Sequence, residues 1–194
     1  MTHRNVKHSR RSNNPRVAET GFSLIEMSIA LMVLLIVAVS TMSLAGISLA
    51  TTENQGHFQA RTAEYAQDKM EQLLSLTFCD ATTDTTVYPA ANTGGTGLAG
   101  CINNANTNIP PTPVAGGSLS FSAPTTGYVD YVDTNGNPTS SSGNWQYMRV
   151  WEISLPSGSN LLKQITVSCE IKAGVGAGGA TPKTTIVSLK SYPF

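Results

Sequence analysis

The sequence predicts an α+β protein in which one long N-terminal helix packs against a C-terminal antiparallel β-sheet. An uncharged apolar run covers residues 27–50, helical spacing of apolar residues continues to about Leu76, and apolar and polar residues alternate after Trp145. At 194 residues with 40% apolar side chains, the chain has room for one modest domain and an additional element.

The composition is typical of a secreted or surface-exposed β-rich chain and argues against a cytosolic enzyme. Charged residues make up 12% of the chain, against about 25% in ordinary soluble proteins. The net charge of zero hides an asymmetry, because residues 1–21 carry five basic side chains and one acidic one, or +4, and the rest carries −4. The later basic residues are scattered singly, so no nucleic-acid-binding surface is expected.

The apolar run is long enough to cross a bilayer, since 24 residues of α-helix span roughly 36 Å. Five basic residues precede the run and none lies between Arg16 and Arg61; the five are Arg4, Lys7, Arg10, Arg11 and Arg16. The positive-inside rule therefore places the N-terminus in the cytoplasm and the C-terminal part outside.

Two simpler interpretations of the run are an ordinary secretory signal peptide and a plain single-pass anchor. The small residues Ser48 and Ala50, on either side of Leu49, suit a signal peptidase. However, the apolar core of a signal peptide is typically about 7 to 15 residues long, and this run is longer.

Neither interpretation explains Glu26, a carboxylate at the cytoplasmic end of an otherwise uncharged apolar stretch. Burying a carboxylate in such a place is costly unless a cation pairs with it. If the chain is cut after Gly21, Glu26 becomes the fifth residue and the new α-amino group of Phe22 supplies a cation. Stacked copies could then pair Glu26 of one subunit with the Phe22 amine of the next, which would set their axial register. The alternative is that Glu26 lies among lipid headgroups.

Residues 21–26, Gly-Phe-Ser-Leu-Ile-Glu, follow a basic leader and precede an uninterrupted apolar helix. This arrangement closely resembles the class III signal of type IV pilins and type II secretion pseudopilins. The resemblance implies that a prepilin peptidase cuts after Gly21 and N-methylates Phe22, and that Glu26 guides assembly. It also implies the pilin fold.

The resemblance and the residue patterns together divide the chain into five segments. Residues 1–21 form a cleaved leader, 22–50 a transmembrane and filament-core helix, and 51–77 the outer half of the same helix. The outer half has an apolar face for packing on a sheet, made by Phe58, Tyr65, Met70, Leu73 and Leu74. Residues 78–127, which contain many Thr, Asn, Gly and Pro, predict a long irregular connection before a sheet region at 128–194.

At least three strands are expected in the sheet region. Residues 145–153 and 161–171 read as a hairpin across the turn at Pro156–Ser159, and Thr184–Leu189 reads as a third strand. This order loosely resembles minor pilins and pseudopilins of the PilV and general secretion I type.

Three cysteines lie on the side expected to be outside, where disulfides persist. We favour a disulfide between Cys79 and Cys101, with pairing to Cys169 and no disulfide as the alternatives.

No catalytic or metal-binding constellation is expected. Two of the three histidines, His3 and His8, lie in the leader, which leaves His57 alone. Four residues invite comparison with calcium ligands: Asp130, Asp133, Asn135 and Asn137. The glycine of a calcium loop is misplaced among them and no glutamate closes the loop, so an Asn-Gly turn explains them better. We therefore expect no cofactor and no enzyme activity.

The function expected from this reading is that of a minor pilin. Before assembly it would lie in the bacterial inner membrane, and it would then join a cell-surface type IV pilus. Its expected partners are membrane lipid, prepilin peptidase, the inner-membrane assembly platform and other pilin or pseudopilin subunits. The alternatives are a pseudopilin in a periplasmic pseudopilus of a type II secretion system and, from another class, a secreted or membrane-anchored binding module. Methylated Phe22 at the mature N-terminus, instead of Thr51 or Met1, would distinguish the classes.

Overall fold

A computed structural model describes residues 21–105, 109–157, 159–172 and 181–193. The predicted leader lies outside the described residues except for Gly21. The described residues have an α+β layout, in which helix α1 (Leu24–Ser75) precedes eight β-strands. The chain divides into two compact units between Gly46 and Ile47.

Helix α1 begins two residues later and ends one residue earlier than the sequence predicts. The Ser23 carbonyl accepts hydrogen bonds from the backbone N–H groups of Glu26 (3.0 Å) and Met27 (3.1 Å), which start the helical ladder. Within the first unit and just beyond it, Leu24–Leu49 has a mean hydropathy of 2.4 and is long and apolar enough to cross a membrane.

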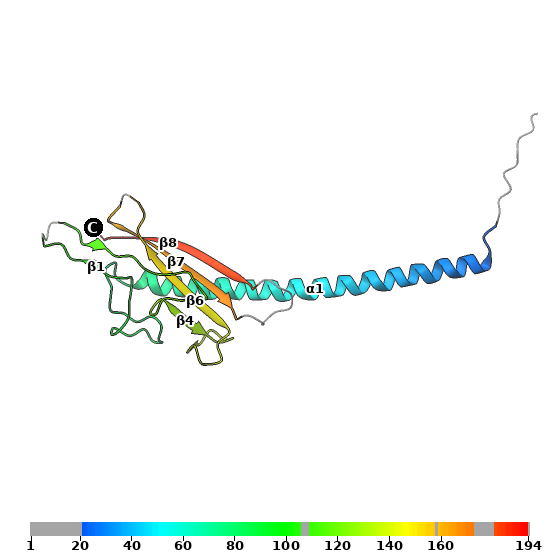
Figure 1. Ribbon diagram of the computed structural model, residues 1–194, viewed down its shortest axis with the longest axis horizontal. Helices are drawn as coiled ribbons and strands as arrows, with labels where there is room; N and C mark the ends of the chain where they lie inside the picture. The colour runs from blue at the N-terminus through cyan, green and yellow to red at the C-terminus, as the bar shows by residue number, and fades with distance from the viewer. Residues whose placement is uncertain (1–20, 106–108, 158, 173–180, 194) are drawn as a thin grey trace, which may run out of the picture. The chain divides into compact units, whose positions relative to one another are not determined.

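The second unit contains a six-stranded antiparallel sheet in the order β5-β4-β6-β7-β8, with β3 also paired to β6 (Figure 1). Its strands are β3 (Gly116–Gly117), β4 (Val129–Val132), β5 (Pro138–Thr139), β6 (Tyr147–Ser154), β7 (Leu162–Ile171) and β8 (Lys183–Ser191). The three longest, β6, β7 and β8, are the three that the sequence predicts. The three shorter ones were not predicted.

The core lies between α1 and one face of this sheet. Alternate residues of β6 and β7 form cross-strand pairs on that face, such as Trp151 with Val167 and Ile153 with Ile165. Of the five apolar helix positions predicted to pack there, Tyr65, Met70 and Leu73 are buried, and Phe58 and Leu74 are partly buried against the core. The predicted apolar face of the helix is therefore confirmed.

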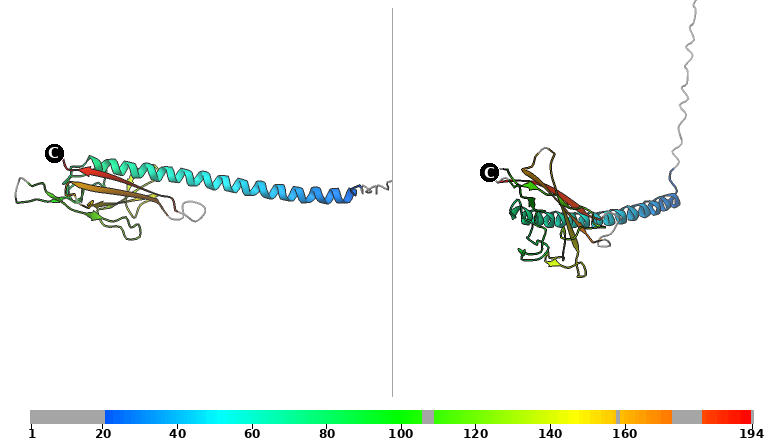
Figure 2. Two further views of the ribbon diagram at one scale, coloured as in Figure 1. Left: turned by 90° about the horizontal axis from the view of Figure 1, so that it is seen from above. Right: turned by 60° about the vertical axis from the view of Figure 1, so that its left-hand side comes forward.

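Within the second unit, α1 and β8 lie alongside each other and run in the same direction (Figure 2). Near the start of β8, the Gln59 side-chain amide donates to the Thr184 hydroxyl (2.9 Å). Near its end, the Lys190 ammonium donates to the Leu74 carbonyl and so satisfies one of the carbonyls at the C-terminal end of the helix.

The segment 78–127 is more ordered than the irregular connection that its composition predicts. Strands β1 (Cys101–Ile102) and β2 (Thr112–Pro113) form a separate two-stranded sheet, and β3 joins the main sheet. Near its start, the Asp80 carboxylate accepts from the backbone N–H of Thr83 at 2.9 Å. Gly97 has a positive φ of 50°, and a Cβ there would collide with Asp80. Local side-chain hydrogen bonds thus hold parts of this segment in place of regular ladders.

Candidate functional site

The predicted cleavage position lies directly before α1, in residues without regular secondary structure. Gly21, Phe22 and Ser23 are outside the helix, and the Phe22 side chain is 79% exposed. The fold gives no reason for a glycine at position 21, because a Cβ there would meet no described atom within 4 Å and its φ is not positive. Gly21 and Phe22 are both exposed in the described chain, and cleavage between them stays a prediction.

Glu26 lies in the first turn of α1, three residues after Ser23. A carboxylate there is stabilised by the free N–H groups and the dipole of the helix N-terminus, by about 0.3 to 1 kcal/mol. Among the described residues, its side chain makes no hydrogen bond or ion pair. It is the single charged residue of the Leu24–Leu49 segment.

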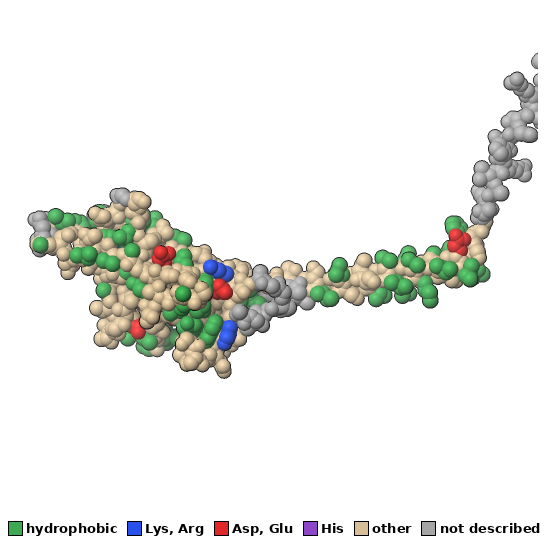
Figure 3. Space-filling view, viewed as in Figure 1, with side chains coloured by type: hydrophobic (Ala, Val, Ile, Leu, Met, Phe, Trp, Pro, Cys, Tyr) green, Lys and Arg blue, Asp and Glu red, His purple; other side chains and the backbone are tan. Residues whose placement is uncertain are grey.

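The apolar segment of α1 has no protein cover in the described chain. All its side chains from Leu24 to Leu49 are exposed, and Figure 3 shows hydrophobic side chains along it. Such an apolar surface is larger than soluble monomers usually expose to water.

A buried ion network joins α1 to the sheet, and sequence reasoning missed it. The Asp130 carboxylate on β4 accepts from Arg149 on β6 through two bonds, Nε to Oδ1 (2.7 Å) and Nη2 to Oδ2 (2.9 Å). The Lys69 ammonium on α1 donates to Asp130 Oδ2 at 2.7 Å. Arg149 also reaches the half-exposed Asp68 on α1 at 2.8 Å, so two cations meet two carboxylates.

The charges within this network shift one another's protonation. Burial raises the pKa of the Asp130 carboxyl, but the positive charges of Lys69 and Arg149 and their hydrogen bonds outweigh burial and hold that pKa below its ordinary value. For Lys69, burial lowers the pKa and Asp130 offsets only part of the effect. The Lys69 ammonium also lies 4.0 Å from the centre of the Trp151 ring, in a cation–π contact.

A second buried cation holds the 78–100 segment against the sheet. The Lys163 ammonium, on the inner face of β7, donates to the carbonyls of Phe78 (2.9 Å), Leu98 (2.7 Å) and Gly100 (2.6 Å). All three of its protons therefore find backbone acceptors. Burial lowers the pKa of Lys163 to about 8, and Asp80 opposes that shift.

The disulfide joins Cys79 to Cys101, the pairing that the sequence analysis favoured. It closes a loop between cysteines 22 residues apart. Cys169 is free and buried, and burial raises the pKa of its thiol to about 12, which keeps it protonated and unreactive.

The residues considered as calcium ligands serve two structural purposes. Asp130 belongs to the ion network. Asp133 caps a turn, because its Oδ1 accepts from the backbone N–H groups of Asn135 (2.8 Å) and Asn137 (2.9 Å). Gly136 has a positive φ of 83°, as an Asn-Gly turn requires. In the described part of the chain, no group of three or more acidic, histidine or cysteine side chains could hold a metal.

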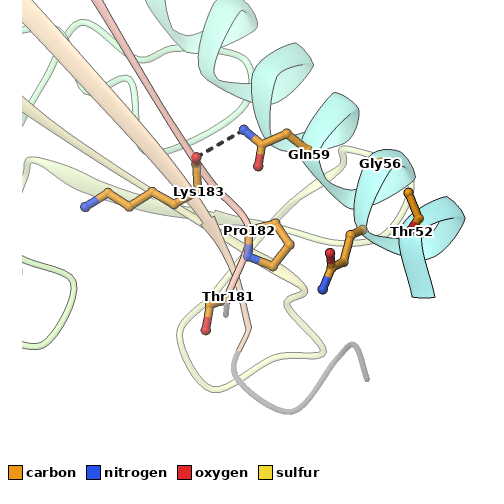
Figure 4. Close-up of a pocket in the computed structure, with 7 residues that line it drawn as sticks. Thr52, Gly56, Gln59, Thr181, Pro182 and Lys183 are labelled. Carbon is orange, nitrogen blue, oxygen red and sulfur yellow. Dashed lines mark hydrogen bonds between the residues drawn. The ribbon is translucent and has the colours of Figure 1, made fainter. Parts of the chain in front are cut away.

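A cleft of about 560 Å³ in the second unit lies between α1 and the start of β8 (Figure 4). Neutral polar side chains from both elements line it, among them Thr52, Gln59 and Thr181. The Gln59 amide donates across it to the Lys183 carbonyl at 3.2 Å, and the Lys183 side chain points away from it (Figure 4). The described residues that line this cleft include no carboxylate, histidine or cysteine.

Comparisons with family models, with curated proteins and with solved structures give no match for this chain.

Proposed function

We propose that the chain is a structural subunit, a minor pilin, which a prepilin peptidase cuts after Gly21 and which packs through its N-terminal helix into a type IV pilus. The proposal rests on two adjacent features: exposed residues at the Gly21–Phe22 bond and, directly after them, an apolar helix that no other part of the described chain covers. Neither the glycine nor the exposed surface has a purpose within the folded chain itself.

The apolar surface of that helix would be covered in two successive stages. The bacterial inner membrane covers it before assembly, with the N-terminus in the cytoplasm, and helices of neighbouring pilin subunits cover it in the filament. The α+β layout, with the outer half of α1 packed on an antiparallel sheet, suits the pilin fold. The same features suit a pseudopilin of a type II secretion system.

Glu26 is proposed to pair with the new Phe22 amine of an adjacent subunit. In the uncut chain Phe22 has no free amine. The Glu26 carboxylate accordingly has no partner among the described residues. The helix-dipole role of Glu26 is local and small, and an assembly role predicts a much larger effect of its removal.

The test uses the full chain in cells that contain a prepilin peptidase, with the wild type, Gly21→Leu and Glu26→Gln compared by intact mass and by recovery in sheared filaments. We expect a mature wild type beginning at methylated Phe22 and an uncut Gly21→Leu precursor in the membrane. A mature N-terminus at Thr51 or at Met1 would refute the proposal.

Glu26→Gln should be cut normally but should fall at least a hundredfold in the filament fraction. A buried ion pair that loses one partner costs about 3 to 5 kcal/mol. Equal incorporation of both forms would leave Glu26 without an assembly role. Recovery of the wild type in surface filaments favours the pilus, and its retention in the periplasm favours the pseudopilus.

A further inference from the structure

The outer edge of the main sheet carries a row of free backbone groups on β8. The Tyr192 N–H donates to the Leu161 carbonyl at 2.8 Å, which fixes the register, so the even-numbered residues of β8 bond to β7. The N–H and C=O groups of Thr185, Val187 and Leu189 therefore point away from β7. Among the described residues, no hydrogen bond uses these groups.

The features that usually protect an exposed strand edge are missing along this row. Natural proteins keep such edges from pairing by means of charged side chains, prolines, bulges or a covering element. β8 has no charged residue and no proline between Lys183 and Lys190, and its ladder to β7 has no bulge. Val187 and Leu189 are each 58% exposed beside the free groups. The edge is therefore suited to pairing with a further strand.

Helix α1 leaves this edge accessible because it lies on the inner face of the sheet. Thr184 and Lys190, both even-numbered, bond to α1 through their side chains. The odd-numbered residues of β8 place their side chains on the outer face, and Thr185, Val187 and Leu189 are all exposed. A further strand could lie beside β8 without displacing the helix.

Only an extended backbone matches the free groups. Along one edge of an antiparallel strand, the groups recur at every second residue, about 6.8 Å apart, and each such residue offers one donor and one acceptor. Another extended chain has the same spacing, whereas a sugar or a lipid headgroup has no such repeat. Peptide segments that add a strand to a sheet bind in this way, with affinity from the backbone and specificity from alternate side chains.

The side chains beside the row indicate what kind of segment fits. Residues that lie opposite one another in an antiparallel pair have their side chains on the same face. Those opposite Val187 and Leu189 would therefore lie on the outer face, next to exposed apolar side chains. Apolar or β-branched residues suit these positions, and charged residues do not.

A second copy of the chain is a poorer occupant of the edge. Within the second unit, α1 and β8 run in the same direction (Figure 2). Two β8 strands paired antiparallel, as all strands of this sheet pair, would orient their two α1 helices in opposite directions. Copies inserted in one membrane from the same side could not pair in this way, and this step alone rests on the proposed function.

We propose that the free edge of β8 binds an extended, uncharged segment of a partner protein, which adds a seventh strand to the sheet. The backbone groups of Thr185, Val187 and Leu189 hold the segment, and its alternate apolar side chains lie beside Val187 and Leu189.

The test is NMR-detected amide hydrogen exchange of the full chain in detergent micelles, with and without a synthetic peptide. The probe is acetyl-Glu-Thr-Val-Thr-Val-Thr-Glu-amide, whose terminal glutamates keep it soluble and lie beyond the free row. Its control is the same peptide methylated at the backbone nitrogens of both valines, which cannot donate to β8.

The unmethylated peptide should slow exchange at Thr185, Val187 and Leu189 and leave Ile186 and Ser188 unchanged. With a Kd of about 1 mM, peptide at about 5 mM should slow exchange about six-fold, because these amides exchange from the free form. The methylated peptide should have no such effect.

Two variants test the edge from the protein side. Val187→Pro removes one free N–H without touching the ladder to β7, and it should abolish the slowing at Thr185 and Leu189. Val187→Thr keeps the N–H and the β-branched shape and should bind the peptide like the wild type. If Val187→Pro does not fold, the methylated peptide gives the same test on the wild type.

Three outcomes would overturn the proposal. One is unchanged exchange at about 5 mM peptide, and another is equal slowing by the methylated peptide. The third is slowing without peptide that grows with protein concentration, which would make a second copy the occupant. The mature N-terminus, which tests the proposed function, is measured separately and does not depend on these results.

Discussion

Asp130 is the residue on which the attachment of the helix to the sheet depends most. Its carboxylate is 4% exposed and pairs with a lysine from α1 and an arginine from β6. Burying one such pair brings little net stability, because the loss of hydration offsets the attraction. Removing a single member is different, since it leaves the remaining charges buried without a counterion.

Asp130→Asn should therefore lower the free energy of unfolding by about 3 to 5 kcal/mol at pH 7. The folded pKa of Asp130 lies below its ordinary value, so its stabilisation is complete above that value and is lost as the pH falls through the folded pKa. Urea unfolding of the full chain in detergent micelles, between pH 7 and pH 3, measures both effects.

The difference in stability between the wild type and Asp130→Asn should accordingly shrink toward acid pH. Asp133→Asn is the matched control, because it changes a turn carboxylate that lies three residues along the chain and outside the ion network, and it should cost much less. A gap between wild type and Asp130→Asn that is unchanged at pH 3 would contradict the ion network as described.

At the residue scale, the buried charged residues are what could not be predicted from the sequence. Asp130 and Val132 face the core from β4, and Arg149 faces it from β6. In an alternating pattern of apolar and polar residues, a charged residue that points into the core cannot be distinguished from one that points into solvent. The Val-Asp-Tyr-Val strand was hidden for this reason, and its aspartate was first considered as a metal ligand. Only the partners on other elements, which lie far away in the sequence, show its role.

At the scale of the element, β8 ends the sheet with an edge that no described strand covers. The bonds from Tyr192 to the Leu161 carbonyl and from Ile171 to the Pro182 carbonyl fix the register. Even-numbered residues of β8 therefore bond to β7, and odd-numbered ones direct their backbone groups to the free edge. Val187 and Leu189 are each 58% exposed there, and the strand carries no charge between Lys183 and Lys190.

Amide hydrogen exchange in β8 should alternate with a period of two residues. The amides of Thr185, Val187 and Leu189 should exchange much faster than those of Ile186 and Ser188, which are held in the ladder to β7. NMR-detected exchange of the full chain in detergent micelles measures this. Uniform protection along β8 would mean that something covers the edge, such as a second molecule in solution.

The long elements could be predicted because their signals are periodic and repeated. The apolar face of α1 and the alternation in β6, β7 and β8 each involve many residues, so single exceptions do not hide them. Strands β3 and β5 have two residues each, which is too short for any period to be visible. In the sequence, Gly116 and Gly117 of β3 resemble a loop signal. In the fold, Gly117 has a φ of 86° and lets β3 approach the Trp151 carbonyl closely.

At the scale of the whole molecule, the second unit depends on cross-links as well as on its core. The Lys163 ammonium and the Cys79–Cys101 disulfide both hold the 78–101 segment, one to the sheet and one to itself. The candidate cleavage residues, by contrast, could be located from the sequence, because an enzyme outside the chain reads them locally. Their role stays a prediction, because the partners proposed for them lie in other molecules and the fold of one chain does not show them.

Replacing both Cys79 and Cys101 by serine should cost about 3 kcal/mol, since the cross-link closes a loop of 22 residues. A reductant should lower the stability of the wild type by a similar amount and should leave the double variant unchanged. Urea unfolding with and without dithiothreitol measures this. Cys169→Ser is the control: it should respond to reductant like the wild type, and a loss of that response would assign the cross-link to Cys169.

The order of the cysteines along the chain has a consequence for how the protein matures. If the chain is anchored and exported as proposed, it crosses the membrane from its N-terminal end, and Cys79 and Cys101 reach the oxidising side before Cys169, which lies 68 residues later than Cys101. The first pair of thiols to meet an oxidant is thus the native pair. By the time Cys169 arrives it has no free thiol to compete for, and β7 then buries it. On that order of events, correct pairing would need no isomerase to undo a wrong one.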